Sequence, residues 1–169
     1  MDERYRSGSL IQAFMKTILL KTLADTLAFG RLLGQAAQPG DIICLDGDLG
    51  AGKTTLTQAI ALGLEVPADE YVTSPSFAIL HEYQGRIPLY HMDFYRLTDA
   101  ADIQDLGLDE YLFLSGLAVL EWCERAGGLV PATRLKITMT TLPDESRMLI
   151  CDPGVGSWKE RWQNWPWTT

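Results

Sequence analysis

A glycine-rich segment ending in a lysine and a hydroxyl residue is the stretch of this sequence best suited to chemistry. Gly47, Gly52, Lys53 and Thr54 occupy every fixed position of the pattern G-x-x-x-x-G-K-[ST]. In this pattern the glycines let backbone N–H groups surround a phosphate, the lysine binds β- and γ-phosphate oxygens, and the hydroxyl ligates Mg²⁺. The segment therefore predicts a site for ATP and Mg²⁺. Its expected binding residues are Gly47, Asp48, Leu49, Gly50, Ala51, Gly52, Lys53, Thr54 and Thr55.

Two acidic residues are candidates for the metal side of this site. A P-loop usually works with an acid at the end of a neighbouring strand. Glu121 follows the apolar run 117–120, and Asp93 follows the strand-like run 89–92. Either carboxylate could instead be an ordinary solvated group at a strand end. The residues alone leave open which of the two faces Mg²⁺.

A short hydroxyl-rich segment lies between the glycine-rich loop and Asp93. It contains Thr73, Ser74 and Ser76 around Pro75. Such a segment can act as a switch loop, with Thr73 and Ser74 sensing the γ-phosphate. The alternative is a turn stabilised only by local Ser and Thr hydrogen bonds.

The elements that must position these residues alternate between strands and helices. The nearly continuous apolar run 41–46 is typical of a strand buried on both faces, and it leads directly into the glycine-rich loop. We expect further strands at 76–83, 87–93, 117–121, 134–141 and 148–151, and helices at 22–38, 55–62 and 99–115. Strands 76–83 and 87–93 should form a hairpin. This order predicts an α/β fold, a three-layer P-loop NTPase-like sandwich with a mixed central β-sheet.

The chain of 169 residues has the length of one domain. We divide it into an N-terminal extension at 1–14, a P-loop ATPase domain at 15–156 and a Trp-rich C-terminal tail at 157–169. The tail carries four tryptophans, which could dock a partner. We favour the interpretation that the tail folds back over the apolar surface of its own domain.

Composition and charge limit the location and the partners. The residues are 47% apolar and 21% charged, and no apolar run reaches the length of a membrane span. With no export signal at the N-terminus and three cysteines outside any metal-type spacing, we expect a cytoplasmic protein with no membrane partner. The net charge of −8 lacks the basic excess of proteins that bind nucleic acid alone. If nucleic acid is involved, another subunit should hold it.

Four blocks of the sequence together resemble the TsaE (YjeE) family. They are the glycine-rich loop at 47–55, the segment 72–77, the segment 91–97 and the residues 120–122. The resemblance implies a small ATPase that is required for threonylcarbamoyladenosine in tRNA, beside the anticodon. It further implies that the protein acts with TsaD and TsaB and that ATP turnover resets their complex. The protein would contact tRNA only indirectly, through that complex.

The resemblance also implies roles for individual residues. Thr54 and Glu121 would hold Mg²⁺, and Lys53 would hold the phosphates. Asp93 and the loop containing Thr73 and Ser74 would serve hydrolysis or switching. The implied catalytic residues are therefore Lys53, Asp93 and Glu121. No block of the family pattern falls on the first fourteen residues or on the tail.

Three other classes of nucleotide-binding protein share the glycine-rich loop. A small-molecule kinase usually adds an arginine-bearing lid, and this chain has no arginine cluster. A GTPase of the usual kind needs an Asn-Lys-x-Asp motif, but the sole asparagine is Asn164 in the tail. A non-catalytic scaffold would not need an intact Lys53 and Thr54 together with two spare acids.

Overall fold

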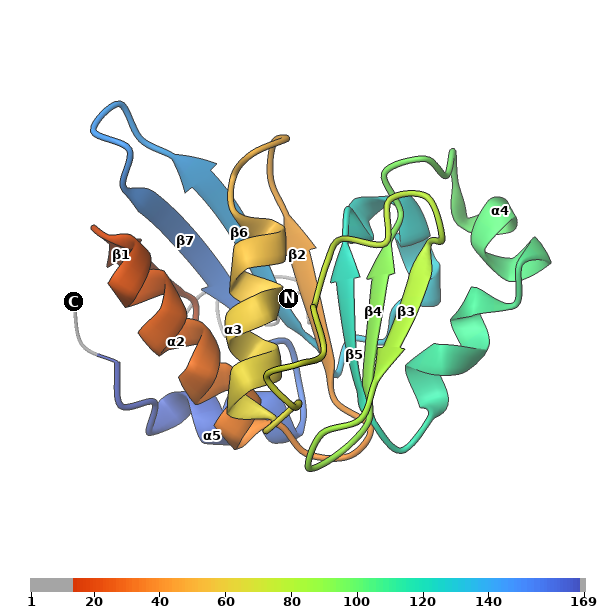
Figure 1. The fold of residues 1–169 in the computed structure, drawn as a ribbon, viewed down its shortest axis with the longest axis horizontal. Coiled ribbons are helices and arrows are strands. Elements are labelled where there is room, and N and C mark those ends of the chain that lie inside the picture. The colour runs from red at the N-terminus through yellow and green to blue at the C-terminus, as the bar shows by residue number, and fades with distance from the viewer. Residues whose placement is uncertain (1–13, 168–169) are drawn as a thin grey trace, which may run out of the picture.

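The computed structural model describes residues 14–167, so the expected extension at 1–14 lies almost entirely outside the described residues. Its centre is a seven-stranded sheet in the order β1-β7-β6-β2-β5-β4-β3 (Figure 1). The strands are β1 (Lys16–Leu20), β2 (Ile42–Asp46), β3 (Leu80–Tyr83), β4 (Leu89–Asp93), β5 (Leu117–Glu121), β6 (Leu135–Thr141) and β7 (Arg147–Asp152). The helices are α2 (Leu23–Ala36), α3 (Lys53–Gly63), α4 (Ala100–Asp105), α5 (Ser157–Gln163) and the 3₁₀ segments η1 (Leu108–Phe113) and η2 (Cys123–Leu129).

The sheet is mixed, as the sequence predicted. β2 pairs in parallel with β5 and β6, and β5 pairs in parallel with β4. β3 and β7 pair antiparallel with their neighbours, and β1 pairs antiparallel with β7. Because β2, β4 and β5 run the same way, their carboxyl ends lie at one edge of the sheet. Asp46, Asp93 and Glu121 end these three strands.

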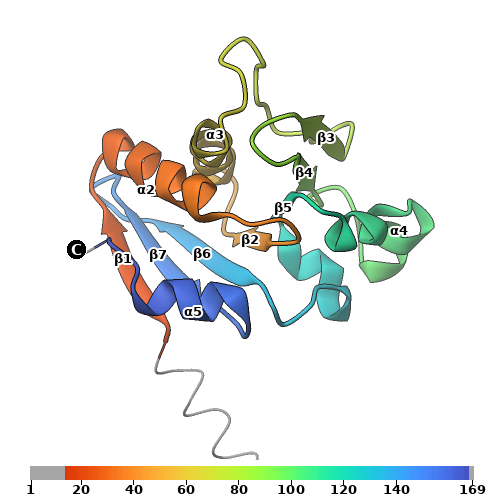
Figure 2. The same cartoon turned by 90° about the horizontal axis from the view of Figure 1, so that it is seen from below.

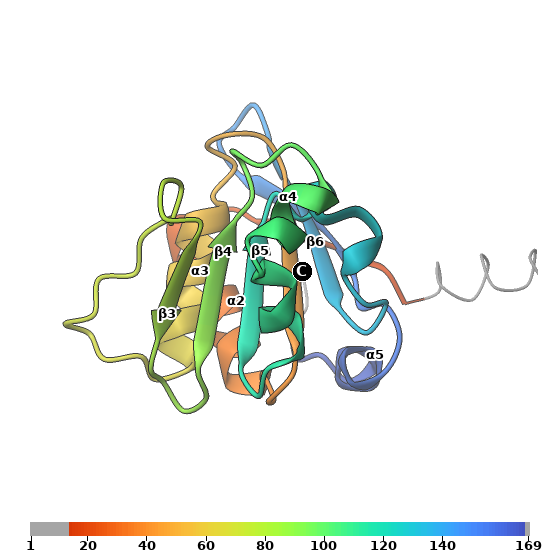
Figure 3. The same cartoon turned by 90° about the vertical axis from the view of Figure 1, so that its right-hand side faces the viewer.

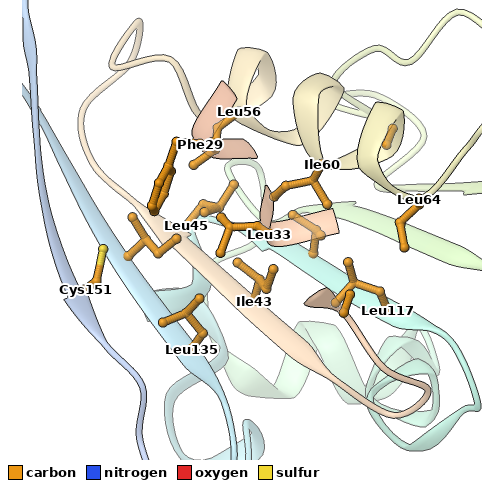
Figure 4. Packing of buried hydrophobic residues seen from close by; sticks show 14 of the residues in the cluster. Phe29, Leu33, Ile43, Leu45, Leu56, Ile60, Leu64, Leu117, Leu135 and Cys151 are labelled. Atoms are coloured by element: carbon orange, nitrogen blue, oxygen red, sulfur yellow. The ribbon is translucent and has the colours of Figure 1, made fainter. Parts of the chain in front are cut away.

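Helices cover both faces of this sheet, which gives the expected three layers (Figures 2 and 3). On one face, Phe29 and Leu33 of α2 and Leu56 and Ile60 of α3 pack over the apolar side of the central strands (Figure 4). The two helices approach so closely that a Cβ atom at Gly34 would meet the carbonyl oxygen of Ile60. The position of α3 matters for function because the P-loop opens into its first turn.

The C-terminal tail packs into the same core as the helices. Trp158 and Trp162 of α5 are fully buried and Trp165 is nearly so. The guanidinium of Arg161 donates two hydrogen bonds to the buried carboxylate of Asp41, at 2.7 and 2.8 Å. This ion pair holds α5 against the start of β2. The described part of the tail thus folds back onto the apolar core of the domain through Trp158, Trp162 and Trp165.

The structure contains β1 and α5, which we did not expect, and it departs from the expected elements in other places too. Residues 76–79 are a loop and not the start of a strand, because the hydroxyl of Ser76 turns inward to Asp93 and Ile79 adopts a positive φ of 70°. The helix expected at 99–115 is divided into α4 and η1 at Gly107, where φ is 68°. The strand expected at 148–151 is one residue longer at each end and forms β7.

Two of the three cysteines lie side by side, which we did not predict. Cys44 and Cys123 have their Cα atoms 5.4 Å apart, while Cys151 is buried elsewhere in the core. The two residues are 79 positions apart in sequence, and only the pairing of β2 with β5 brings them together.

Among the described residues, no helix has both the length and the apolar character needed to cross a bilayer.

Candidate nucleotide-binding site

The candidate site lies at the carboxyl edge of β2, β5 and β4. In open α/β sheets this edge is where ligands bind, because the loops that follow parallel strands meet there. The loop 47–52 joins β2 to α3 and is visible above these strands in Figure 1. The structure thus brings the P-loop, Glu121 and Asp93 to one place, although they are far apart in the sequence.

The P-loop needs glycine for both steric and conformational reasons. Gly47 has a φ of 144°, and a Cβ atom there would collide with the carbonyl oxygen of Met139 on β6. Gly52 has a φ of 104° and directly precedes α3. These left-handed conformations turn the backbone around the end of the helix, where free N–H groups and the positive end of the helix dipole favour an anion. The loop is therefore built to receive phosphate.

The side chain of Lys53 lies folded over the P-loop. Its ammonium donates hydrogen bonds to the carbonyl oxygens of Gly47 and Asp48, at 2.7 and 2.9 Å. It also lies 4.3 Å from the centre of the Trp122 ring, within the range of a cation–π contact. Burial lowers the pKa of Lys53, although the carboxylates of Glu121 and Asp93 oppose this effect. The site thus holds a poorly hydrated cation next to the P-loop.

Glu121 is the acid that faces the hydroxyl of the P-loop. The hydroxyl of Thr54 donates to Glu121, with distances of 3.0 Å to Oε1 and 3.3 Å to Oε2. Nε2 of the buried His91 lies 2.9 Å from the same Oε1. Both the hydroxyl and the carboxylate are hard oxygen donors, the type that Mg²⁺ prefers, and Mg²⁺ commonly takes its remaining ligands from phosphates and water. These residues fit a Mg²⁺ ion that arrives with a nucleotide.

Asp93 has different partners from Glu121, and they come from the hydroxyl-rich loop. Its Oδ2 accepts hydrogen bonds from Ser74 at 2.6 Å and from Ser76 at 3.0 Å. Its Oδ1 accepts from the backbone N–H of Tyr95 at 2.9 Å. Thr73 lies at the start of this loop, where its N–H donates to the hydroxyl of Tyr83. Asp93 therefore ties the loop 73–76 to the end of β4, beside the phosphate site.

Two hollows meet at the P-loop. One, of about 310 Å³, is lined by Lys53, Thr54, Asp93 and Glu121, and also by the aromatic rings of Tyr95 and Trp122. The other, of about 340 Å³, lies between α2, the β6–β7 end and the P-loop, and Gly52 and Thr55 line both. A phosphate chain in the first hollow would thus have room beside it for the rest of a nucleotide.

Several residues around these hollows were not among the sequence candidates. His91, Ser76 and Trp122 contact Glu121, Asp93 and Lys53 respectively. Arg147 on β7 donates from Nε to the carbonyl oxygen of Ala51 in the P-loop, at 2.9 Å. The sequence did carry one signal for His91, because residues two apart on a strand share a face and His91 precedes Asp93 by two.

The comparison with known protein families agrees with this geometry. A family model described as "Threonylcarbamoyl adenosine biosynthesis protein TsaE" matches residues 20–149, which include β2, the P-loop, Asp93 and Glu121. The chain belongs to the TsaE family. The resemblance that the four sequence blocks carried is confirmed, and membership makes the chain a nucleotide-binding P-loop protein.

Individual members of the TsaE family are similar over most of the chain. The TsaE protein of Bacillus subtilis is 42% identical over 136 residues, which cover 79% of this chain and 84% of that relative. The TsaE protein of Treponema pallidum is 38% identical, and the match covers 75% of this chain and 93% of the relative. Both relatives are named tRNA threonylcarbamoyladenosine biosynthesis proteins.

A solved structure supports the fold assignment. The crystal structure of YdiB from Bacillus subtilis matches with a TM-score of 0.73 and 35% identity. The match covers 89% of this chain and 92% of that one. The predicted α/β class with a mixed central sheet is confirmed by this similarity and by the observed strand order.

Proposed function

We propose that this TsaE family member is the ATP-binding and ATP-hydrolysing subunit required for threonylcarbamoyladenosine modification of tRNA. It acts with TsaD and TsaB, and its ATP turnover resets their complex. One observation carries the hydrolytic part of the proposal: the Thr54 hydroxyl and the Glu121 carboxylate lie 3.0 Å apart beside an intact P-loop. The link to tRNA modification rests on the names of the relatives.

Each site residue has a proposed role that follows from its position. The backbone of residues 47–52 and the side chain of Lys53 bind the β- and γ-phosphates, and Lys53 exchanges its carbonyl partners for phosphate oxygens. Thr54 and Glu121 hold Mg²⁺ through their oxygen atoms. When bound, Mg²⁺ would supply positive charge for the phosphate oxygens as the bond to the γ-phosphate breaks. Trp122 covers Lys53 and excludes water from one side of the site.

Asp93 and its loop have a proposed role in hydrolysis or switching. Asp93 holds the hydroxyls of Ser74 and Ser76 close to the hollow that also contains Lys53 and Glu121. A γ-phosphate in that hollow would compete with Asp93 for these hydroxyls. Thr73 and Ser74 would then report the state of the nucleotide through the position of their loop, which is the usual logic of a switch segment.

The net charge of −8 supports indirect contact with tRNA. Binding to the phosphates of nucleic acid needs a surplus of Lys and Arg, which this chain lacks. The partner subunits therefore hold the tRNA.

The second hollow is the proposed site for the nucleoside part of ATP. Replacing Arg147 by methionine keeps most of the unbranched stem of the side chain but removes its hydrogen bond to the P-loop carbonyl. We expect ADP to bind about tenfold more weakly, because part of the ~1.5–3 kcal/mol of a charged hydrogen bond that holds the P-loop in its binding conformation is lost. Isothermal calorimetry with ADP measures this loss. The control is Arg134→Met, because Arg134 lines a different hollow; equal losses in both variants would contradict the assignment.

The decisive experiment for the proposed function measures ATP hydrolysis by the purified protein, alone and with TsaD and TsaB. We expect hydrolysis near background for the protein alone and a clear increase when both partners are present. The Lys53→Ala variant serves as the blank. Brisk hydrolysis that ignores the partners would contradict the proposal, and phosphorylation of a metabolite by the isolated protein would favour a small-molecule kinase.

A further inference from the structure

The buried side chain of His91 contacts Glu121, the proposed Mg²⁺ ligand. His91 is the third residue of β4 and is 0% exposed. In the parallel pairing of β4 with β5, His91 lies opposite Val119, and Asp93 lies opposite Glu121. Glu121 thus lies two residues further along β5 than the partner of His91. The imidazole crosses from β4 to this carboxylate, and Nε2 lies 2.9 Å from Oε1.

The hydrogen-bond pattern leaves one oxygen of Glu121 less occupied than the other. Oε1 is contacted both by Nε2 of His91 at 2.9 Å and by the Thr54 hydroxyl at 3.0 Å. Among the residues that the structure describes, Oε2 has only the longer contact of 3.3 Å to the same hydroxyl. A glutamate has three rotatable bonds, so a contact from a rigid strand restricts where its free oxygen can point. Glu121 lines the hollow that also contains Lys53 and the P-loop, so this restriction acts on a carboxylate at the proposed Mg²⁺ site.

The same histidine is poorly explained as a packing residue. Within residues 14–167, its Nδ1 is buried and has no hydrogen-bond partner. A buried polar atom without a partner costs free energy that an apolar side chain of similar size would avoid. Within the described part of the chain, the polar contact that the His91 side chain makes is to Glu121, and it comes at a free-energy cost to the core.

We propose that His91 is a positioning residue that donates from Nε2 to Glu121 and so orients this carboxylate for the Mg²⁺ of the bound nucleotide. The inference rests on the proposed function, in which Glu121 and Thr54 hold that ion. Hydrogen-bond partners of a metal ligand typically change metal affinity or activity by about 10–100-fold when removed. The donation requires a proton on Nε2 of His91.

The test compares two substitutions of His91 by calorimetric binding of ADP, with Mg²⁺ and with a chelator. Leucine fills the space without a donor, whereas glutamine keeps an N–H at a similar reach. For His91→Leu we expect the affinity gained on adding Mg²⁺ to fall about 10–100-fold, with chelator affinity unchanged. His91→Gln should retain most of the gain. A leucine variant with the full Mg²⁺ gain, or a glutamine variant that loses as much as leucine, would overturn the inference.

Glu121→Gln separates the failure of this inference from the failure of the proposed function. If Glu121→Gln itself leaves the Mg²⁺ gain intact, Glu121 is not the metal ligand and the proposed function is wrong on that point. If Glu121→Gln removes the gain but His91→Leu does not, only the role of His91 fails.

A measurement on the unmodified protein covers the case in which the leucine variant does not fold. The chain has two histidines, so ¹⁵N NMR can resolve both imidazoles. A proton on Nε2 of His91 is the expected result. A neutral ring protonated only at Nδ1 cannot donate to Glu121 and would overturn the inference.

Discussion

Replacing Lys53 by alanine is expected to weaken ATP binding by about two orders of magnitude or more. The ammonium makes two hydrogen bonds, to the carbonyls of Gly47 and Asp48, which phosphate oxygens would replace. Hydrogen bonds that involve a charged group contribute about 1.5–3 kcal/mol each, so two of them correspond to at least about 100-fold in affinity. Burial that already lowers the pKa of Lys53 strengthens the expectation, because a poorly hydrated cation gains more from an anionic ligand.

Calorimetric titration with a non-hydrolysable ATP analogue measures this effect. Lys136→Ala is a matched control, because Lys136 is 38% exposed, pairs with Asp46 and lines a different hollow from Lys53. Circular dichroism of both variants without nucleotide checks that the fold is kept. An Lys53→Ala variant that binds with the affinity of the unmodified protein would show that the P-loop does not bind phosphate in the proposed way.

The second large effect is expected at Glu121. Glu121→Gln keeps the size of the side chain and a neutral oxygen near Thr54 but removes the negative charge. We expect Mg²⁺-dependent turnover by the complex with its partners to fall by about 100-fold or more, since metal stabilisation of transition-state charge is worth several kcal/mol. Binding of ADP in the presence of a chelator should stay within about twofold, because Glu121 does not touch the phosphates in the proposal.

Asp93→Asn is the comparison that makes the Glu121 prediction specific. Its expected effect is to loosen the loop 73–76, because an amide is a weaker acceptor for the hydroxyls of Ser74 and Ser76. Turnover should fall, while the gain in ADP affinity on adding Mg²⁺ should remain. If Asp93→Asn loses that gain and Glu121→Gln keeps it, the two acids have been assigned the wrong way round.

The parts of the site that could be predicted from sequence are those with local signals. The P-loop pattern is contiguous, and the apolar run before it and the helix after it are both recognisable within about ten residues. The helix expected at 22–38 is present as α2, and it begins with a capping box in which the hydroxyl of Thr22 accepts from the N–H of Asp25 and the carboxylate of Asp25 accepts from the N–H of Thr22. These features need no knowledge of which strands are neighbours.

The choice between Glu121 and Asp93 could not be made from local signals because it depends on tertiary geometry. Thr54 and Glu121 are 67 residues apart, and their contact exists only because β5 pairs with β2. Both acids end parallel strands at the same edge, so their sequence contexts look alike. Their different partners, a P-loop hydroxyl for one and two serines for the other, appear only in three dimensions. The contact of His91 with Glu121 was missed for the same reason.

The distribution of tryptophans gives this protein two separate optical reporters. Trp122 stands over the ammonium of Lys53 at the nucleotide site, whereas the four tryptophans of the tail belong to the region of α5 and the core beneath it. A change in intrinsic fluorescence on adding nucleotide would therefore arise from Trp122, and a change on heating would be dominated by the tail. A Trp122→Phe variant would silence the first signal and keep the second, so ligand occupancy and unfolding could be followed in the same cuvette.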